Sequence, residues 1–201
     1  MIAVIDYGVG NLFSVEKAFA ATGEEVIVTG NSEDLKAADK LVLPGVGAFG
    51  DCMKNLESTD LIPIILEQIN NKKPLFGICV GLQILFEDSE ESPNVKGLGV
   101  FKGTVKKINA PQLKIPHMGW NVISIRNSKL FNGLNENPYF YFVHSYHAVP
   151  KDKNLIAATA DYGEELTAAV IKDNIYATQF HPEKSGDVGL KIIENFVKIK
   201  E

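Results

Sequence analysis

Cysteine is scarce in this sequence, which holds only Cys52 and Cys79 among 201 residues. Two cysteines are too few for the disulfide framework of a small secreted domain. No third cysteine lies near a histidine at the spacing of a metal-binding set. We therefore expect reduced thiols, a cytoplasmic protein and no bound metal.

Clustered positive charge is absent as well. The formal net charge is -5, and no segment carries the stripe of Lys and Arg that displaces counterions from nucleic acid. Residues 1–6 (MIAVID) lack a basic region and reach an acid at Asp6, which is not typical of a signal peptide or a membrane-spanning segment. We expect no nucleic-acid partner and no membrane partner.

What the sequence does hold is an alternation of strands and helices. Hydrophobic residues make up 45% of the chain, enough for one large core, and the length favours a single domain over residues 1–201. In the first half, short runs rich in β-branched residues predict strands, and apolar residues at helical spacing predict helices. The predicted strands are 2–5, 25–29, 40–43 and 74–78, and the predicted helices are 12–21 and 61–69.

The second half has a different rhythm. After residue 99, strand-like segments follow one another until a helical stripe at 188–199, and the polar run 87–94 predicts a solvated loop. The predicted strands are 100–108, 121–126, 139–143, 155–160, 168–171 and 176–180. The two halves together predict an α/β fold with a mixed, largely parallel central sheet flanked by helices and an antiparallel extension.

One strand-to-turn segment carries the pattern of a catalytic nucleophile. Residues 74–83 (PLFGICVGLQ) combine a buried-type strand, a Gly-x-Cys-x-Gly turn and a helical pattern that continues through 84–86. This is the nucleophile-elbow pattern with cysteine in place of serine, and its two glycines leave room for the strained turn. The amino end of the helix favours a thiolate, so we predict Cys79 as nucleophile. Cys52 lacks such glycines and is expected to be a structural or bystander thiol.

A base and an orienting group follow another predicted strand. Residues 179–183 (QFHPE) place His181 two positions before Glu183. A thiolate nucleophile needs a proton acceptor and a group that holds that acceptor in place. We predict His181 as the base and Glu183 as its orienter. The other histidines, His117, His144 and His147, are expected to be ordinary hydrogen-bonded residues.

A glycine-rich loop has two competing interpretations. Residues 40–50 (KLVLPGVGAFG) contain G-x-G-x-x-G after a strand, which superficially matches a dinucleotide-binding turn. We reject that interpretation, because the loop follows the third predicted strand instead of the first and begins with a proline. Backbone amides beside the elbow suit an oxyanion hole better, and the candidates are those of Gly45, Val46, Gly47 and Val80.

The PGVG, GxCxGLQ and HPEKS segments, in this order, resemble the class I glutamine amidotransferases over nearly the whole chain. Within that class, residues 6–11 (DYGVGN), 116–120 (PHMGW) and 141–146 (YFVHSY) are similar to the glutaminase subunits of imidazole glycerol phosphate synthases. The resemblance implies hydrolysis of glutamine to glutamate and ammonia through a Cys79 thioester, without a cofactor. It also implies a separate cyclase subunit, a (β/α)8 barrel in a heterodimer, which takes the ammonia through a channel to make imidazole glycerol phosphate and aminoimidazole carboxamide ribotide in histidine biosynthesis.

The same resemblance assigns further residues. Those expected to contact glutamine are Gln83, Glu91, Ser145 and Tyr146. Those expected at the cyclase interface are Asn11, Pro116, Met118, Trp120, Tyr141 and Lys184, although Trp120 also suits ordinary core packing. The resemblance further implies that the Gly45–Val46 peptide can turn over, so that an amide replaces a carbonyl at the oxyanion hole when the partner is loaded.

Three other functions remain open. A glutaminase for pyridoxal phosphate, anthranilate or purine synthesis would share the three motifs, and segments 6–11 and 116–120 argue against it. A stand-alone cysteine hydrolase would account for Cys79 and His181 but not for the rest. A scaffold subunit without chemistry would show a broken nucleophile, base or orienter, and all three are present.

Overall fold

A computed structural model describes residues 1–126 and 129–199. Its strands are β1 (Ile2–Ile5), β2 (Val26–Thr29), β3 (Lys40–Leu43), β4 (Leu75–Ile78), β5 (Asp88–Ser89), β6 (Gly103–Lys107), β7 (His117–Val122), β8 (Ser124–Ile125), β9 (Tyr139–His144), β10 (Tyr146–Pro150), β11 (Ile156–Asp161), β12 (Glu165–Lys172) and β13 (Ile175–Thr178). Its helices are α1 (Leu12–Ala20), α2 (Ser32–Ala37), α3 (Phe49–Glu57), α4 (Ile62–Asn70), α5 (Val80–Gln83) and α6 (Gly186–Lys198), with short 3-10 turns η1 (Lys129–Phe131), η2 (Lys153–Leu155) and η3 (Pro182–Lys184).

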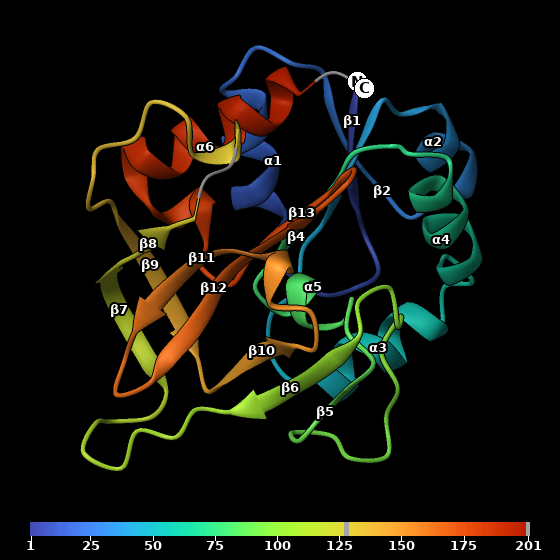
Figure 1. Ribbon diagram of the computed structural model, residues 1–201. Coiled ribbons are helices and arrows are strands. Elements are labelled where there is room, and N and C mark those ends of the chain that lie inside the picture. The colour runs from blue at the N-terminus through green and yellow to red at the C-terminus, as the bar shows by residue number, and fades with distance from the viewer. Residues whose placement is uncertain (127–128, 200–201) are drawn as a thin grey trace.

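The central sheet has the strand order β2-β1-β3-β4-β13-β12-β11-β8 (Figure 1). The first five strands in this order, from β2 to β13, are parallel to one another. Beyond β13 the sheet continues through β12, β11 and β8, and each of these strands is antiparallel to the one before it. Two smaller sheets lie beside it, β10-β6-β5 and β7-β9. This confirms the predicted α/β fold with a largely parallel sheet and an antiparallel extension.

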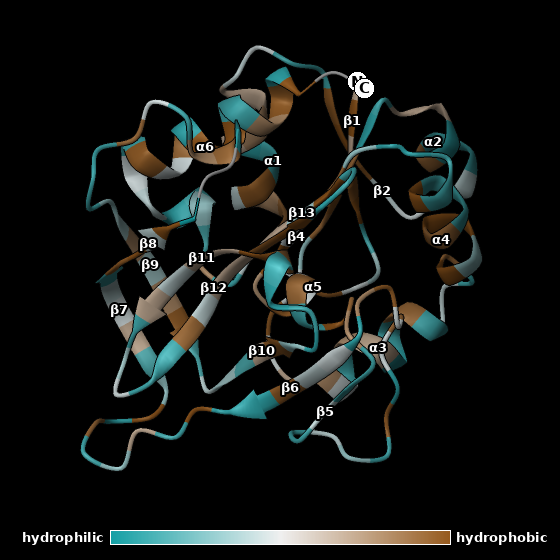
Figure 2. Ribbon diagram, viewed as in Figure 1, coloured by the Kyte–Doolittle hydropathy of each residue, from teal (hydrophilic) through white to brown (hydrophobic). Residues whose placement is uncertain are grey.

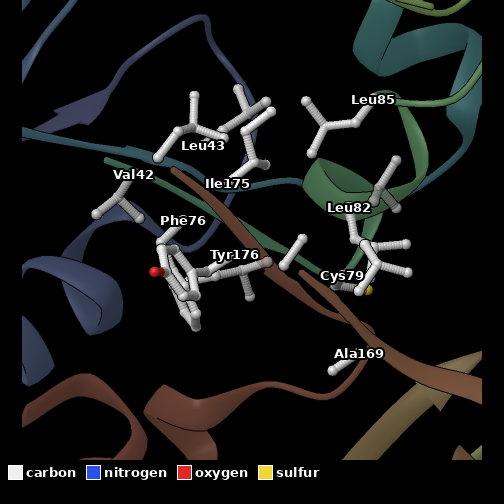
Figure 3. Close-up of a cluster of buried hydrophobic side chains, with 14 of the residues drawn as sticks. Val42, Leu43, Phe76, Cys79, Leu82, Leu85, Ala169, Ile175 and Tyr176 are labelled. Carbon is white, nitrogen blue, oxygen red and sulfur yellow. The ribbon is translucent and has the colours of Figure 1, made fainter. Parts of the chain in front are cut away.

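Helices cover both faces of the sheet. Val42, Phe76 and Tyr176 are register partners on three adjacent strands and point to one face of the sheet (Figure 3). On that face Phe76 contacts Phe19 of α1 and Phe196 of α6 at ring-centroid distances of 6.1 and 5.0 Å. Helices α2 and α4 pack together on the other side (Figure 1). Hydrophobic colouring is concentrated in the central strands and on the inner sides of these helices (Figure 2), as expected for parallel strands buried on both faces.

The first-half predictions are confirmed to within one residue at each end. Helices α2 and α3 were not predicted. Helix α2 has only six residues, although Asn31 is an N-cap signal and its Oδ1 accepts a hydrogen bond from the Glu33 amide at 2.8 Å. Helix α3 is as long as α1 and buries Phe49, Cys52, Met53 and Leu56 at helical spacing, a signal that the sequence prediction missed. In the second half, the last helix and the strands near 100–108, 139–143, 155–160, 168–171 and 176–180 are also present, with shifted ends, and β10 was not predicted.

Two second-half predictions are wrong. Residues 121–126 do not form one strand, because β7 pairs with β9 while β8 pairs with β11, and the buried Ile123 lies where the chain passes from one sheet to the other. The run 87–94 is not simply a solvated loop, because β5 pairs with β6 and Ser89 is buried.

Within residues 1–126 and 129–199, none of the helices has the length and apolar character needed to cross a bilayer.

Candidate active site

Cys79 occupies a sharp turn between β4 and α5. Its backbone has φ of 56° and ψ of -111°, which places a non-glycine residue in the left-handed region, a strained conformation that is common at functional sites. A Cβ added to Gly81 would overlap the backbone carbonyl of Leu43, and one added to Gly77 would lie 3.1 Å from the Gly81 carbonyl oxygen. The predicted need for both elbow glycines is therefore confirmed.

The helix after the elbow is shorter than predicted. It ends at Gln83, because the carbonyls of residues 84–86 accept hydrogen bonds from the amides of Leu98, Gly99 and Phe101 instead of continuing the helix. The expectation that the helix runs through 84–86 is wrong. A helix of four residues also provides little dipole, so activation of this thiol would have to come from its neighbours.

His181 and Glu183 form a buried pair directly after β13. His181 Nδ1 lies 2.7 Å from Glu183 Oε1, and both side chains are only 2% exposed. The His181 amide also donates to the Tyr141 carbonyl at 3.0 Å, which ties this turn to β9. Because Glu183 occupies Nδ1, the ring presents Nε2, which has no hydrogen-bond partner among the described residues, and His181 lines the same pocket as Cys79.

The electrostatics of the pair favour a protonated imidazole. Burial alone lowers the pKa of His181, but its interactions with the Cys79 thiolate and the Glu183 carboxylate outweigh this effect and raise the pKa to about 10. A charged imidazolium beside a thiolate is the ground state that an activated cysteine nucleophile requires. Among the described residues, no cluster of His, Cys, Asp and Glu could hold a metal ion.

A cavity of about 360 Å³ opens above Cys79, within the range of small-ligand sites. Most of its lining was predicted from the sequence as catalytic, oxyanion, substrate or interface residues. The predicted residues that line it are Val46, Gly47, Cys79, Val80, Gln83, Glu91, Pro116, Ser145, Tyr146, His181 and Lys184, and Val143 and His144 line it as well.

The glycine-rich loop approaches the elbow with a carbonyl instead of an amide. The Val80 N–H donates to the Gly45 carbonyl at 3.3 Å, so this candidate oxyanion donor is occupied. The backbone carbonyls before and after the Gly45–Val46 peptide each have a side-chain partner. Tyr7 Oη donates to the Pro44 oxygen at 2.6 Å, and Cys52 Sγ lies 3.3 Å from the Val46 oxygen. Cys52 therefore contacts the loop, and burial raises its pKa to about 11.

Two of the predicted glutamine contacts have partners within the chain. Glu91 Oε2 accepts a hydrogen bond from the Phe49 amide at 2.8 Å. Gln83 Nε2 donates to the Tyr146 carbonyl and to Gln179 Oε1, each at 3.0 Å. The sequence prediction missed Gln179, whose Nε2 lies 3.6 Å from Cys79 Sγ. Its position two residues before His181, directly after β13, was the available signal.

The residues predicted at a partner interface lie on neighbouring elements. Asn11 caps α1, Lys184 belongs to η3, and Tyr141 is on β9, while both α1 and β9 contact η3. Met118 and Trp120 on β7 are 62% and 55% exposed, so the interpretation of Trp120 as core packing is wrong. Phe13 and Tyr139, which the sequence prediction did not select, are 68% and 56% exposed.

The family model "Glutamine amidotransferase class-I" matches residues 3–199. The chain therefore belongs to the class I glutamine amidotransferases, a family of glutamine-hydrolysing enzymes.

The curated relatives are more specific. The chain is 52% identical to "Imidazole glycerol phosphate synthase subunit HisH" of Methanocaldococcus jannaschii, covering 99% of this chain and 100% of the relative. It is 53% identical to the protein of the same name from Methanothermobacter thermautotrophicus, covering 99% and 98%. Among solved structures, PurLQS of Thermotoga maritima shares the fold with a TM-score of 0.78 at 19% identity, covering 98% of this chain and 96% of that chain.

Proposed function

We propose that this protein is the glutaminase subunit of an imidazole glycerol phosphate synthase, which hydrolyses L-glutamine and supplies ammonia to a separate cyclase. The similarity to relatives of that name over the full chain supports the biological role. One structural observation carries the chemistry: a strained Cys79 shares a pocket with His181, whose other nitrogen is held by Glu183 at 2.7 Å. The catalytic roles of these three residues are part of the proposal.

In the first half-reaction, the Cys79 thiolate attacks the side-chain amide carbon of glutamine and forms a C–S bond. His181, protonated at the start because its pKa is raised to about 10, gives a proton to the leaving nitrogen as the C–N bond breaks and ammonia departs. A glutamyl thioester remains on Cys79.

In the second half-reaction, the same histidine acts as a base. Thioester formation removes the thiolate charge that raises the His181 pKa, so the ring is left neutral after it has protonated the ammonia. It takes a proton from water as the water attacks the thioester, the C–S bond breaks, glutamate leaves and the thiolate is restored. These steps require no metal and no organic cofactor.

The pocket provides candidate contacts for the rest of glutamine. Gln83, Ser145 and Tyr146 border the cavity, and Glu91 places a carboxylate there that can pair with the substrate ammonium group. The Glu91 carboxylate also accepts the Phe49 amide, which fixes its position at the start of α3. We assign substrate binding to these four residues.

We propose that the oxyanion hole forms by a peptide rotation between Gly45 and Val46. In the present arrangement the Gly45 carbonyl accepts the Val80 N–H. Rotation of this peptide would free the Val80 N–H from the Gly45 carbonyl and turn the Val46 N–H toward the developing oxyanion. The Gly47 N–H would be a further donor. The anchored carbonyls of Pro44 and Val46 restrict the change to this peptide.

The proposed partner is a cyclase with a (β/α)8 barrel that forms a heterodimer with this chain and receives ammonia through a channel. Exposed Met118 and Trp120 would be buried in the interface, together with Asn11, Tyr141 and Lys184. Pro116, which borders the pocket beside β7, would link that interface to the active site. We further propose one domain over residues 1–201 and a cytoplasmic location.

The proposal is tested by measuring glutamate release from glutamine by the chain alone and with a cyclase subunit bound to its nucleotide ligand. Wild type should be weakly active alone and strongly stimulated by the loaded partner, and Cys79→Ala should be inactive in both conditions. High activity without any partner would indicate a stand-alone hydrolase. Stimulation only by a different synthase would reassign the chain to another branch of the family.

A further inference from the structure

A continuous series of hydrogen bonds runs from β7 through the end of β9 to the first residue of β10. The Asn121 Nδ2 group lies 3.2 Å from His117 Nε2, His117 Nδ1 lies 2.9 Å from His144 Nε2, and His144 Nδ1 lies 2.9 Å from the Tyr146 carbonyl oxygen. His117 and His144 are buried, at 3% and 6% exposure. The series begins on the strand that carries the exposed Met118 and Trp120.

The donor and the acceptor of each hydrogen bond can be assigned, because Asn121 at one end must donate and the Tyr146 carbonyl at the other end must accept. Asn121 Oδ1 accepts the Val122 amide at 2.8 Å and Nδ2 donates to the Asp161 carbonyl at 2.8 Å, so Nδ2 can only donate to His117. Burial lowers the pKa of His117 to about 4 and that of His144 to about 3, so both rings are neutral at pH 7. Each ring then carries its proton on Nδ1, and the last proton points at the Tyr146 carbonyl, which can only accept.

The Tyr146 carbonyl connects this series of hydrogen bonds to Cys79. Because the Tyr146 oxygen accepts, the Gln83 nitrogen must donate to it, and its second N–H points at Gln179 Oε1 at 3.0 Å. The oxygen of the Gln179 amide is therefore occupied, and its Nε2 is the atom that faces Cys79 Sγ at 3.6 Å. Gln179 is fully buried, and turning its amide over would place its N–H group against the N–H of Gln83, so the Nε2 atom stays on the side of the sulfur.

We propose that Gln179 is a further catalytic residue, whose side-chain N–H stabilises the Cys79 thiolate, and that the hydrogen bonds from Asn121 through His117 and His144 hold the Tyr146 carbonyl in the position from which Gln83 keeps this donor aimed at the sulfur. An N–H donor favours a thiolate over a thiol because hydrogen bonds to charged acceptors are stronger. The same donor stabilises the thiolate as it leaves the thioester in the second half-reaction. This inference deepens the proposed glutaminase function and rests on it.

The first test measures the thiolate directly, without glutamine. Site-specific alkylation of Cys79 by iodoacetamide is followed by mass spectrometry as a function of pH, in wild type and in Gln179→Met, which keeps the side-chain length and removes the donor. The midpoint should move upward by about one pH unit, since a hydrogen bond to a charged group changes a pKa by that order. Gln68→Met is the matched control, because Gln68 is also buried but lies on α4, and it should leave the midpoint unchanged.

The second test needs no change at position 179. In nitrogen-15 NMR spectra of the full chain, His117 and His144 should both carry the proton on Nδ1, and the Gln179 side-chain amide signals should titrate with the Cys79 alkylation midpoint. Asn121→Asp replaces the first donor with an acceptor and should convert His117 to the Nε2–H form. An unchanged alkylation midpoint in Gln179→Met, or Gln179 signals that do not respond to Cys79, would overturn the proposal.

These readouts separate two failures. If Cys79 alkylation shifts as expected but no cyclase elicits glutamate release, the proposed function is wrong and the role of Gln179 stands. If glutamate release is normal and Gln179→Met alters neither the alkylation midpoint nor turnover, the inference about Gln179 is wrong.

Discussion

The amide of Val80 and the carbonyl of Gly45 are hydrogen bonded to each other at 3.3 Å, so the residue after Cys79 donates its N–H to the glycine-rich loop and not into the pocket. The two backbones are in close contact at this point. A Cβ on Gly45 would lie 2.5 Å from the Gly81 nitrogen and 2.9 Å from the Val80 carbonyl carbon.

Gly45→Ala should impair both the fold and the reaction. The added methyl group collides with backbone that cannot move aside, so we expect a loss of about 1–3 kcal/mol in the free energy of unfolding. Partner-stimulated glutaminase activity should fall about 10²-fold, because the oxyanion donors are displaced. Chemical denaturation and glutamate release measure the two effects, and normal values for both would show that loop and elbow separate in solution.

Glu183→Gln should slow the reaction without unfolding the protein. The amide keeps the size of the side chain but removes the charge that holds His181 Nδ1 at 2.7 Å, so kcat should drop by about 10²- to 10⁴-fold. Glu194→Gln serves as the control, since Glu194 pairs with Lys191 and Lys198 on the half-exposed surface of α6, and it should retain full activity. Equal activity of the two variants would remove Glu183 from the mechanism.

The stability of the protein should decrease at alkaline pH through His181. Its folded-state pKa is raised from 6.5 to about 10, so its contribution is fully present below about pH 6.5 and is lost as pH rises through about 10. Cys79→Ala removes one of the two groups that raise this pKa, so its unfolding free energy should decline less over that interval. Denaturant titrations between pH 6 and 10.5 provide the comparison, and parallel curves would contradict the assignment.

Trp120→Ala should weaken partner binding with little effect on folding. The side chain is 55% exposed and its ring meets Tyr141 edge-on at 6.2 Å, so the melting temperature should change only slightly. Removal of a central aromatic residue from an interface costs about 2 kcal/mol or more, a loss of roughly 30-fold in affinity for the cyclase. Calorimetric titration of the cyclase measures it, and unchanged affinity would place the interface elsewhere.

The sequence was sufficient to predict the elements that are defined by local patterns. Parallel strands β1, β3 and β4 are continuous apolar runs, and the glycines around Cys79 have a local steric cause, so both could be identified in advance. The early end of α5 and the split at Ile123 could not, because each depends on pairing with a segment that is distant along the chain. Gln179 was missed for the same reason, since its amide orientation depends on Gln83 and Tyr146.

The position of β13 in the central sheet also affects the synthesis of the protein. This strand inserts between β4 and β12, and the Thr178 carbonyl at its end accepts the backbone N–H of Cys79 at 2.8 Å. The elbow and its base therefore come together only after the last quarter of the chain has left the ribosome and joined strands about 100 residues earlier, a long-range closure of the kind that folds slowly. If Cys79 and His181 act together as proposed, a nascent chain that has not yet reached His181 carries the cysteine without its base and cannot consume glutamine.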